Sequence, residues 1–279
     1  MKLTELSCLA GLPADPEITG LTADSRAVRP GFLFAALNGT RLDGRAFAAE
    51  AAAQGAVAIL TDRAAALSLP PQDRARTAII EDPSPQRRLA LFAARFYRRQ
   101  PRVIGAVTGT NGKTSVAHFL REIWSALGDP AVSLGTLGLV TPQGRRPGAL
   151  TTTDPVALHR DLAALAKTGI DHAAIEASSH GLAQYRLDGV RVAVAAFTNL
   201  TRDHLDYHAD MAHYRAAKDR LFTDLLMPGG SAVLNADSGE FTRLAALCGD
   251  HGHPVLAYGR AAGADLRLVA CRPQDAGQA

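Results

Sequence analysis

The sequence predicts an α/β protein of two domains, with a small α/β domain over residues 1–100 and a doubly wound, mostly parallel-sheet P-loop domain over residues 101–279. Three observations support this fold class. From Gly31 onward, short apolar runs rich in Val, Ile and Phe alternate with Ala-rich segments of helical length, as in parallel sheets. A phosphate-loop pattern follows one of these runs. With 279 residues, 47% of them hydrophobic, the chain is long enough to bury two cores.

The first domain is predicted from alternating strands and helices. Buried strands are expected at GFLFAAL (31–37), AVAILTD (56–62) and TAIIED (77–82). The Ala-rich AFAAEAAAQG between the first two is expected to be a helix. SPQRRLALFAARFYRRQP has apolar residues at helical spacing and ends at Pro101, so we place the domain boundary near residue 100.

The second domain is predicted from six buried strands separated by helix-length segments. They are VIGAVTG (103–109), AVSLGTLG (131–138), HAAIEAS (172–178), VAVAAFTNL (192–200), SAVLNAD (231–237) and PVLAYG (254–259). In a doubly wound sheet, ligands bind at the carboxyl ends of the strands. Functional side chains are therefore expected directly after these strands.

Composition excludes several classes of protein. Lys and Arg exceed Asp and Glu by only three and are scattered, so no nucleic-acid partner is expected. Cys8, Cys248 and Cys271 lack the number and spacing of a disulfide framework or a zinc site. The N-terminus has no secretory signal pattern, and no run of 18 apolar residues predicts membrane insertion. These features indicate a cytoplasmic protein.

The segment AVTGTNGKTS, residues 106–115, resembles a phosphate-binding loop, although Val107 stands where the usual pattern has its first glycine. Gly109 and Gly112 allow backbone N–H groups to converge on an anion. Lys113 offers a charge for terminal phosphates, and Thr114 a hydroxyl for Mg²⁺. The alternative is a tight turn with an incidental lysine. The position between a strand and a helix favours nucleotide binding.

Glu176 ends the apolar run HAAIE and is followed by two serines and a histidine. A carboxylate at this strand end can hold Mg²⁺ beside the phosphate loop. The alternative is a carboxylate that caps the following helix.

The segment FTNLTRDHLDYHADMAHYRAAKDRLF combines histidines, aspartates and a helix that carries Lys218. His204 and Asp206 follow a predicted strand, so metal binding or acid–base chemistry is possible there. For His208 and His213 we expect ordinary exposed positions. Lys218 by itself reads as a solvated helix lysine.

Several motifs together resemble the Mur ligases of peptidoglycan synthesis, in particular the MurE type. They are GTNGKTS (109–115), TTTDP (151–155), EASSHGLAQYR (176–186), FTNLTRDHLDYH (197–208) and HYRAAKDRLF (213–222). DSRAVRPGFLFAAL and LDGRAF, in the first domain, resemble the family's uridine-nucleotide domain. The phosphate loop alone would also suit folate-polyglutamate or cyanophycin-type ligases. SSHGL with TRDHLDYH favours the MurE type.

The resemblance implies roles for matching residues. ATP would be held by Gly109, Thr110, Asn111, Gly112, Lys113, Thr114 and Ser115. Two Mg²⁺ ions would be held by Thr114, Glu176, His204 and Lys218, the last as a carbamate formed with CO₂. Catalysis would depend on Lys113, Glu176, His204 and Lys218. The sugar nucleotide UDP-N-acetylmuramoyl-L-alanyl-D-glutamate would contact Ser25, Thr152, Thr153, Ser178, Gln184 and Arg186.

The resemblance also implies a reaction. ATP would phosphorylate the D-glutamate side-chain carboxylate, and the amine of meso-diaminopimelate or L-lysine would attack the acyl phosphate. Mur ligases carry a third, Rossmann-like domain of about 150 residues. The sequence ends before such a domain, so we expect a monomeric fragment that cannot complete the reaction alone. The alternatives are a non-catalytic module that binds the sugar nucleotide or ATP, and an unrelated P-loop kinase or NTPase.

Overall fold

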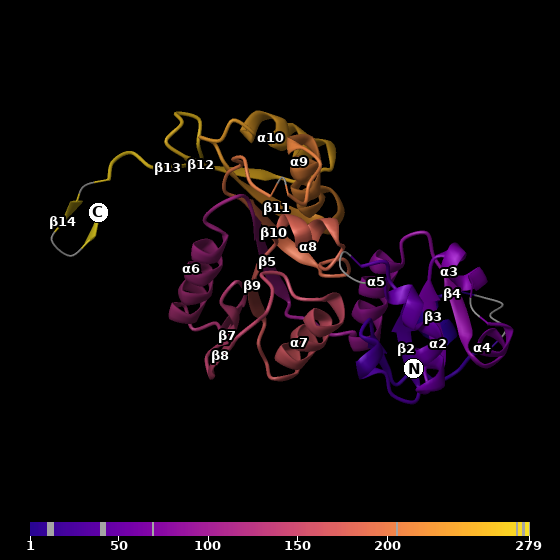
Figure 1. Cartoon of the computed structure of the whole chain (residues 1–279). Coiled ribbons are helices and arrows are strands. Elements are labelled where there is room, and N and C mark those ends of the chain that lie inside the picture. Colours follow the sequence, from indigo (N-terminus) through magenta and orange to yellow (C-terminus); the bar gives the residue numbers. More distant parts are fainter. Residues whose placement is uncertain are drawn as a thin grey trace. The chain divides into compact units, whose positions relative to one another are not determined.

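The computed structural model describes residues 1–9, 14–39, 43–68, 70–204, 206–271, 273–274 and 277–278 (Figure 1). The chain forms two compact units. Unit 1 consists of Met1–Arg99, Asp154–Ala163 and Gln184–Gly189. Unit 2 consists of Gln100–Thr153, Ala164–Ala183 and Val190–Ala279. Two segments beyond residue 100 therefore pack with the first unit.

Unit 1 contains a four-stranded parallel sheet in the order β1-β2-β3-β4. The strands are β1 (Gly20–Thr22), β2 (Phe32–Ala35), β3 (Ala58–Thr61) and β4 (Ala78–Glu81). The helices are α1 (Leu3–Ser7), η1 (Ser25–Ala27), η2 (Gly44–Phe47), α2 (Ala48–Ala53), α3 (Arg63–Ser68), α4 (Pro71–Arg76) and α5 (Pro85–Tyr97). The three strands predicted here are confirmed. β1 was not predicted because its three residues are too short to show a pattern.

Side chains from the sheet of unit 1 fill two hydrophobic clusters. Because successive residues of a strand point to opposite faces, Leu33 belongs to one cluster and Phe34 to the other. Leu60 and Ile59 divide in the same way. Helix α5 adds Phe92 to the first cluster.

The later segments join unit 1 through specific contacts. The side chain of Val156 packs against the cluster that contains Phe92. His159 Nε2 lies 2.9 Å from the backbone oxygen of Asp188, and Arg87 Nε donates to the Asp188 carboxylate at 3.0 Å. These contacts join residues that are far apart in the sequence.

Unit 2 contains a nine-stranded sheet in the order β13-β12-β11-β10-β5-β9-β6-β7-β8. The strands are β5 (Val103–Thr108), β6 (Ala131–Gly135), β7 (Gly138–Thr141), β8 (Gly144–Arg146), β9 (His172–Glu176), β10 (Val192–Phe197), β11 (Leu226–Asn235), β12 (Val255–Gly259) and β13 (Leu266–Arg267). All neighbouring pairs are parallel except β6–β7 and β7–β8. The predicted α/β class with a mostly parallel sheet is confirmed.

One predicted strand, AVSLGTLG, is in fact two. β6 ends at Gly135, and β7 returns antiparallel from Gly138, with these two glycines paired across a two-residue turn. Gly138 has φ +81°, and a Cβ atom there would lie 2.2 Å from the backbone oxygen of Arg146. The turn therefore requires glycine, which the continuous apolar pattern concealed.

The helices of unit 2 connect these strands (Figure 1). They are α6 (Lys113–Ala126), α7 (Pro155–Lys167, which begins in unit 1), α8 (Ser179–Ala183), α9 (Met211–Arg220), the π-helical turn η3 (Leu221–Leu225) and α10 (Phe241–Asp250). Helix α6 packs on β5, β6 and β9, with Ala117 against Val107 and Ala174. A short antiparallel pair, β14 (Pro273–Gln274) and β15 (Gly277–Gln278), ends the chain.

None of the helices in the described ranges is long and apolar enough to cross a membrane.

Candidate active site

The phosphate-loop sequence connects β5 to α6. Gly112, directly before the helix, has φ +86°, and Gly109 has φ +141°. A Cβ atom on Gly109 would lie 1.9 Å from Thr198 Oγ1, so this position requires glycine. Val107 is buried within β5 and packs against α6, before the loop begins. The first glycine of the longer pattern is therefore not needed for this loop.

Residues after β10 hold the loop in place. The Asn111 N–H donates to Asn199 Oδ1 at 3.0 Å, and the Thr110 N–H donates to the Asn199 backbone oxygen at 2.8 Å. Thr198 Oγ1 donates to the Asn111 backbone oxygen at 2.6 Å. Sequence reasoning did not single out Thr198 or Asn199. Their position directly after a predicted strand was the available signal.

Two lysine amines converge on one carbonyl of this loop. Lys113 Nζ donates to the backbone oxygens of Gly109 at 3.0 Å and Thr110 at 2.8 Å. Lys218 Nζ, from α9, donates to the same Gly109 oxygen at 2.8 Å. The Lys218 amine also lies 4.4 Å from the centre of the Tyr214 ring. The loop therefore brings together two lysines that are 105 positions apart in the numbering.

Burial changes the protonation of both amines. Lys218 is only 2% exposed, which contradicts the reading of it as a solvated lysine. Burial and, to a smaller extent, the charge of Lys113 lower the pKa of Lys218 to about 7, against an opposing effect of Asp203. Burial also lowers the pKa of Lys113, against opposing effects of Glu176 and Asp203. A large fraction of Lys218 is therefore neutral near pH 7.

Glu176 lies at the carboxyl end of β9 and is 2% exposed. Its Oε2 accepts hydrogen bonds from Thr114 Oγ1 at 2.9 Å and from Thr136 Oγ1 at 3.2 Å. Its Oε1 accepts the Thr136 backbone N–H at 2.8 Å. A Cβ atom on Gly135 would lie 2.0 Å from this oxygen, so the adjacent glycine makes room for the carboxylate.

Thr136 is a site residue that sequence reasoning missed. It occupies the turn between β6 and β7, which lies inside the segment that was predicted as one strand. The signal was the pair of flanking glycines. A strand end at this point would have placed Thr136 beside the carboxyl end of β9.

Many of the residues described above line a cavity of about 230 Å³. Its lining is formed by Thr110, Asn111, Gly112, Lys113, Thr114, Thr136, Thr151, Glu176, Ser178, Ser179, His204 and Lys218. The predicted residues Lys113, Thr114, Glu176, His204 and Lys218 therefore lie together. The cavity is lined by two amines, one carboxylate, one imidazole and several hydroxyl groups, a combination suited to polyanionic ligands.

His204 lies beside two other histidines. Its ring centre is 4.9 Å from that of His180, and its backbone has φ +53°. His208 is 5% exposed and packs against Tyr214, so the expectation of an exposed position was wrong. Burial lowers the pKa of His208, and the neighbouring charges of His180 and Lys218 act in the same direction. His213 is exposed as expected and pairs with Asp210.

The residues assigned to the sugar nucleotide lie in both units. Thr152 Oγ1 donates to the Glu176 backbone oxygen at 2.9 Å and lies 3.0 Å from Ser178 Oγ. Thr153 is half-buried in unit 2 and does not line the cavity. Ser25, Gln184 and Arg186 belong to unit 1, where Arg186 donates to Gln184 Oε1.

Unit 1 has a separate pocket of about 700 Å³ next to the turn that contains Ser25. The pocket is lined in part by Asp24, which caps that turn, and by the aromatic residues Phe32 and Tyr97. Arg29 and Arg160 add positive charge. Aromatic faces and guanidinium groups suit a base and phosphates.

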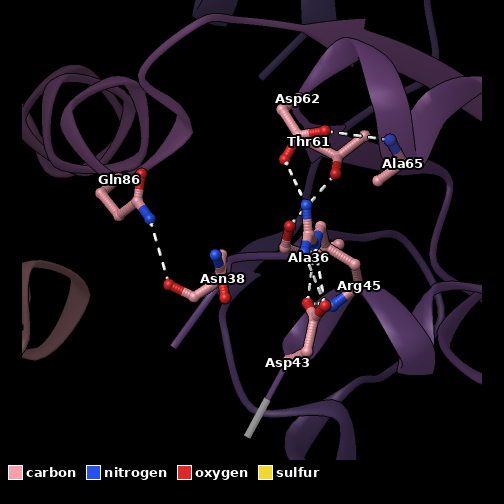
Figure 2. Close-up of polar contacts among 8 residues, drawn as sticks. All are labelled: Ala36, Asn38, Asp43, Arg45, Thr61, Asp62, Ala65 and Gln86. Carbon is pink, nitrogen blue, oxygen red and sulfur yellow. Dashed lines mark hydrogen bonds and ion pairs between the residues drawn. The ribbon is translucent and has the colours of Figure 1, made fainter. Parts of the chain in front are cut away.

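In the LDGRAF motif, whose first residue lies outside the described ranges, Asp43 and Arg45 form polar contacts within unit 1 (Figure 2). Arg45 donates to both oxygens of Asp43 and, at 3.1 Å, to Asp62. Thr61 Oγ1 donates to the Ala36 backbone oxygen at 3.1 Å. These bonds connect the chain after β2 to the end of β3, at the carboxyl edge of the sheet where ligands of parallel sheets bind.

The cavity contains one carboxylate and several hydroxyl groups that are candidate ligands for Mg²⁺. Among the residues that the structure describes, no group of three or more His, Cys, Asp or Glu side chains is arranged to hold a metal ion. Mg²⁺ is commonly held by one or two carboxylates together with water and substrate phosphates. The buried Glu176 carboxylate, hydrogen-bonded to the Thr114 hydroxyl, fits that pattern.

Comparisons with known proteins identify related sequences and folds. The family model "Mur ligase middle domain" matches residues 107–278, and "Mur ligase family, catalytic domain" matches residues 17–97. The chain is 51% identical over 256 residues to a UDP-N-acetylmuramoyl-L-alanyl-D-glutamate–2,6-diaminopimelate ligase of Bradyrhizobium diazoefficiens, covering 91% of this chain and 51% of the relative. A protein of the same name from Caulobacter vibrioides is 48% identical over 272 residues, which cover 95% of this chain and 54% of the relative.

A solved structure with the same ligase name superposes with a TM-score of 0.87 at 30% identity. The superposition covers 100% of this chain and 56% of the chain in that solved structure. The chain thus spans about half the length of the curated relatives it matches.

Proposed function

The chain belongs to the Mur ligase family, and on this basis we propose that it is part of an ATP-dependent ligase that adds 2,6-diaminopimelate to UDP-N-acetylmuramoyl-L-alanyl-D-glutamate. The names of relatives that are about half identical to it support this substrate assignment. The observation that carries the proposal is the convergence of Lys113, Lys218 and Glu176 on one cavity at the phosphate loop.

We assign the triphosphate of ATP to the phosphate loop. In this structure, Lys113 Nζ donates to two loop carbonyls. Phosphate oxygens are stronger acceptors than carbonyl oxygens for the same ammonium group, so ATP would replace these bonds. Helix α6 begins at Lys113, so its positive N-terminal end faces the same position.

Glu176, Thr114 and His204 are the residues that would hold Mg²⁺ in this cavity. The buried neutral fraction of Lys218 suits the reaction of an amine with CO₂, and a Lys218 carbamate would add an anionic ligand. Bound Mg²⁺ neutralises phosphate charge and lowers the repulsion between ATP and an anionic acceptor. Lys113 contributes to the same neutralisation from the chain itself.

The proposed reaction has two steps. A carboxylate oxygen of the D-glutamate side chain attacks the γ-phosphorus of ATP, which breaks the bond to ADP and forms an acyl phosphate. The amine of 2,6-diaminopimelate then attacks the acyl carbon and loses a proton, and inorganic phosphate leaves. Lys113 orients and stabilises the transferred group. The remaining half of the relatives' length would supply further parts of the site.

The sugar nucleotide is assigned to unit 1 and to the threonines near the cavity. The pocket beside Ser25 offers the aromatic and guanidinium groups that a uridine diphosphate requires. The other residues that we assign to the sugar nucleotide are Thr152, Thr153, Ser178, Gln184 and Arg186.

Calorimetry on this chain tests the proposal. We expect saturable binding of UDP-N-acetylmuramoyl-L-alanyl-D-glutamate and, separately, of ATP with Mg²⁺, since each ligand has its own set of contacts. UDP alone serves as the matched control and should bind more weakly than the full sugar nucleotide. Binding of ATP without any binding of the sugar nucleotide would contradict the assigned substrate, and binding of neither would contradict the function.

A further inference from the structure

Ser179 has a buried hydroxyl group that lacks a partner. It is the first residue of α8 and is 2% exposed, yet its Oγ atom makes no hydrogen bond within the described part of the chain. Other buried polar atoms without a hydrogen bond in the described ranges are Thr108 Oγ1, Arg121 Nε, His172 Nδ1, His208 Nε2 and His253 Nδ1. Among these described residues, Ser179 alone lines the cavity of the candidate site.

The preceding residue, Ser178, differs from Ser179 because its hydroxyl has partners within the protein. Ser178 Oγ accepts the Gly181 backbone N–H at 3.1 Å and lies 3.0 Å from Thr152 Oγ1. Its hydroxyl is therefore used inside the protein, where it caps α8. The Ser179 hydroxyl has no such use. A buried hydroxyl without a partner destabilises the folded protein, because it has lost its hydrogen bonds to water. Such a group in a cavity wall is explained when a ligand supplies the missing partner.

The charges around the cavity indicate which kind of ligand atom this is. Lys113 lines the same cavity as Ser179 and is cationic when protonated. A ligand atom that enters near its amine is favoured if it carries negative charge. A serine hydroxyl can donate to such an atom, as an oxyanion accepts hydrogen bonds.

We propose that Ser179 is a binding residue whose Oγ–H donates a hydrogen bond to an anionic oxygen of the ligand in this cavity. The inference rests on the proposed function, because it takes the ligand to be a phosphate group of ATP or a carboxylate of the acceptor. Both sources offer the same chemistry. Ser179 is distinct from Ser178, the serine to which the sugar-nucleotide contact was assigned.

The test compares Ser179→Ala with Thr108→Val. Thr108 Oγ1 is also buried and unpartnered but does not line the cavity, so its loss controls for removal of an unsatisfied hydroxyl. Stability is measured by urea unfolding without ligand. Affinities for ATP with Mg²⁺ and for UDP-N-acetylmuramoyl-L-alanyl-D-glutamate are measured by calorimetry on the full chain.

We expect Ser179→Ala to be at least as stable as the wild type, because no bond is lost in the ligand-free protein. Its affinity for one of the two ligands should fall roughly tenfold, and that ligand identifies the source of the oxygen. Thr108→Val should bind both ligands as the wild type does. Unchanged affinities of Ser179→Ala, or a loss of ligand-free stability without a loss of affinity, would overturn this inference alone. A wild-type chain that binds neither ligand would overturn the proposed function with it.

Discussion

Replacement of Lys218 by methionine is expected to stabilise the ligand-free chain and to abolish the carbamate formation that we propose for this residue. The wild-type protein buries an amine that is charged in water, and the apolar methionine removes this desolvation cost. Each unit of pKa shift corresponds to about 1.4 kcal/mol, so the shift from 10.5 to about 7 corresponds to roughly 5 kcal/mol. The variant also loses the hydrogen bond of Lys218 to Gly109 and its contact with the Tyr214 ring, so a net gain of roughly 2–4 kcal/mol is expected near pH 7. Gly109 keeps its hydrogen bond from Lys113 in this variant.

The effect should depend on pH in a defined direction. Burial lowers the folded-state pKa of Lys218 from 10.5 to about 7, so the unfolded chain binds more protons between these values. Wild-type stability should therefore rise relative to the variant as the pH increases from about 7 to 10.5, and the difference should be constant below pH 7. Urea unfolding in CO₂-free buffer at several pH values measures this. A wild-type chain that is more stable than Lys218→Met at pH 7 would contradict the reading.

Uptake of CO₂ is measured separately, by ¹³C NMR with labelled bicarbonate at pH 8. A carbamate signal is expected in the wild type and should disappear in Lys218→Met. The control is Lys167→Met, which removes an exposed lysine at the end of α7. It should change neither the stability profile nor the carbamate signal. A carbamate signal that persists in Lys218→Met would place the modification elsewhere.

Replacement of Lys113 by alanine is expected to reduce the affinity for ATP with Mg²⁺ by about 100-fold. Hydrogen bonds to charged groups contribute about 1.5–3 kcal/mol, and Lys113 is the loop residue whose charge faces the phosphates in our assignment. Affinity for the sugar nucleotide should change less, because its uridine portion is assigned to unit 1. Calorimetry with both ligands measures this difference.

The ATP affinities of a control variant and of Lys113→Ala itself decide whether this prediction holds. Lys167→Ala, the matched control on an exposed lysine, should bind ATP as the wild type does. Wild-type affinity for ATP in Lys113→Ala would show that the loop does not hold the phosphates, and the assignment of the cavity would then be wrong.

The parts of the fold that were predictable have local causes. β5, β9 and β10 are apolar runs bounded by polar residues, and their carboxyl ends determine where Lys113 and Glu176 lie. Parallel pairing then brings these residues together without further information. The motif resemblance added Lys218, which spacing alone did not distinguish from a solvated lysine, and it implied a specific role for His204, whose position after β10 had already marked it as a candidate.

The parts that were missed depend on tertiary contacts. Thr136 was hidden because the turn between β6 and β7 interrupts an apolar run that reads as one strand. His208 was expected at the surface, but ring packing against Tyr214 and His180 buries it. The segments that join unit 1 after residue 153 are held by contacts such as that of His159 with Asp188. None of these partners can be inferred from neighbouring residues in the sequence.

A crystal structure of this chain with Mg²⁺ and a non-hydrolysable ATP analogue would show whether the phosphate loop holds ATP. We expect the β- and γ-phosphates to occupy the 230 Å³ cavity beside Glu176. The Lys113 amine should have moved from the Gly109 and Thr110 carbonyls to phosphate oxygens. A nucleotide bound elsewhere, or phosphates bound while Lys113 keeps both carbonyl contacts, would contradict it.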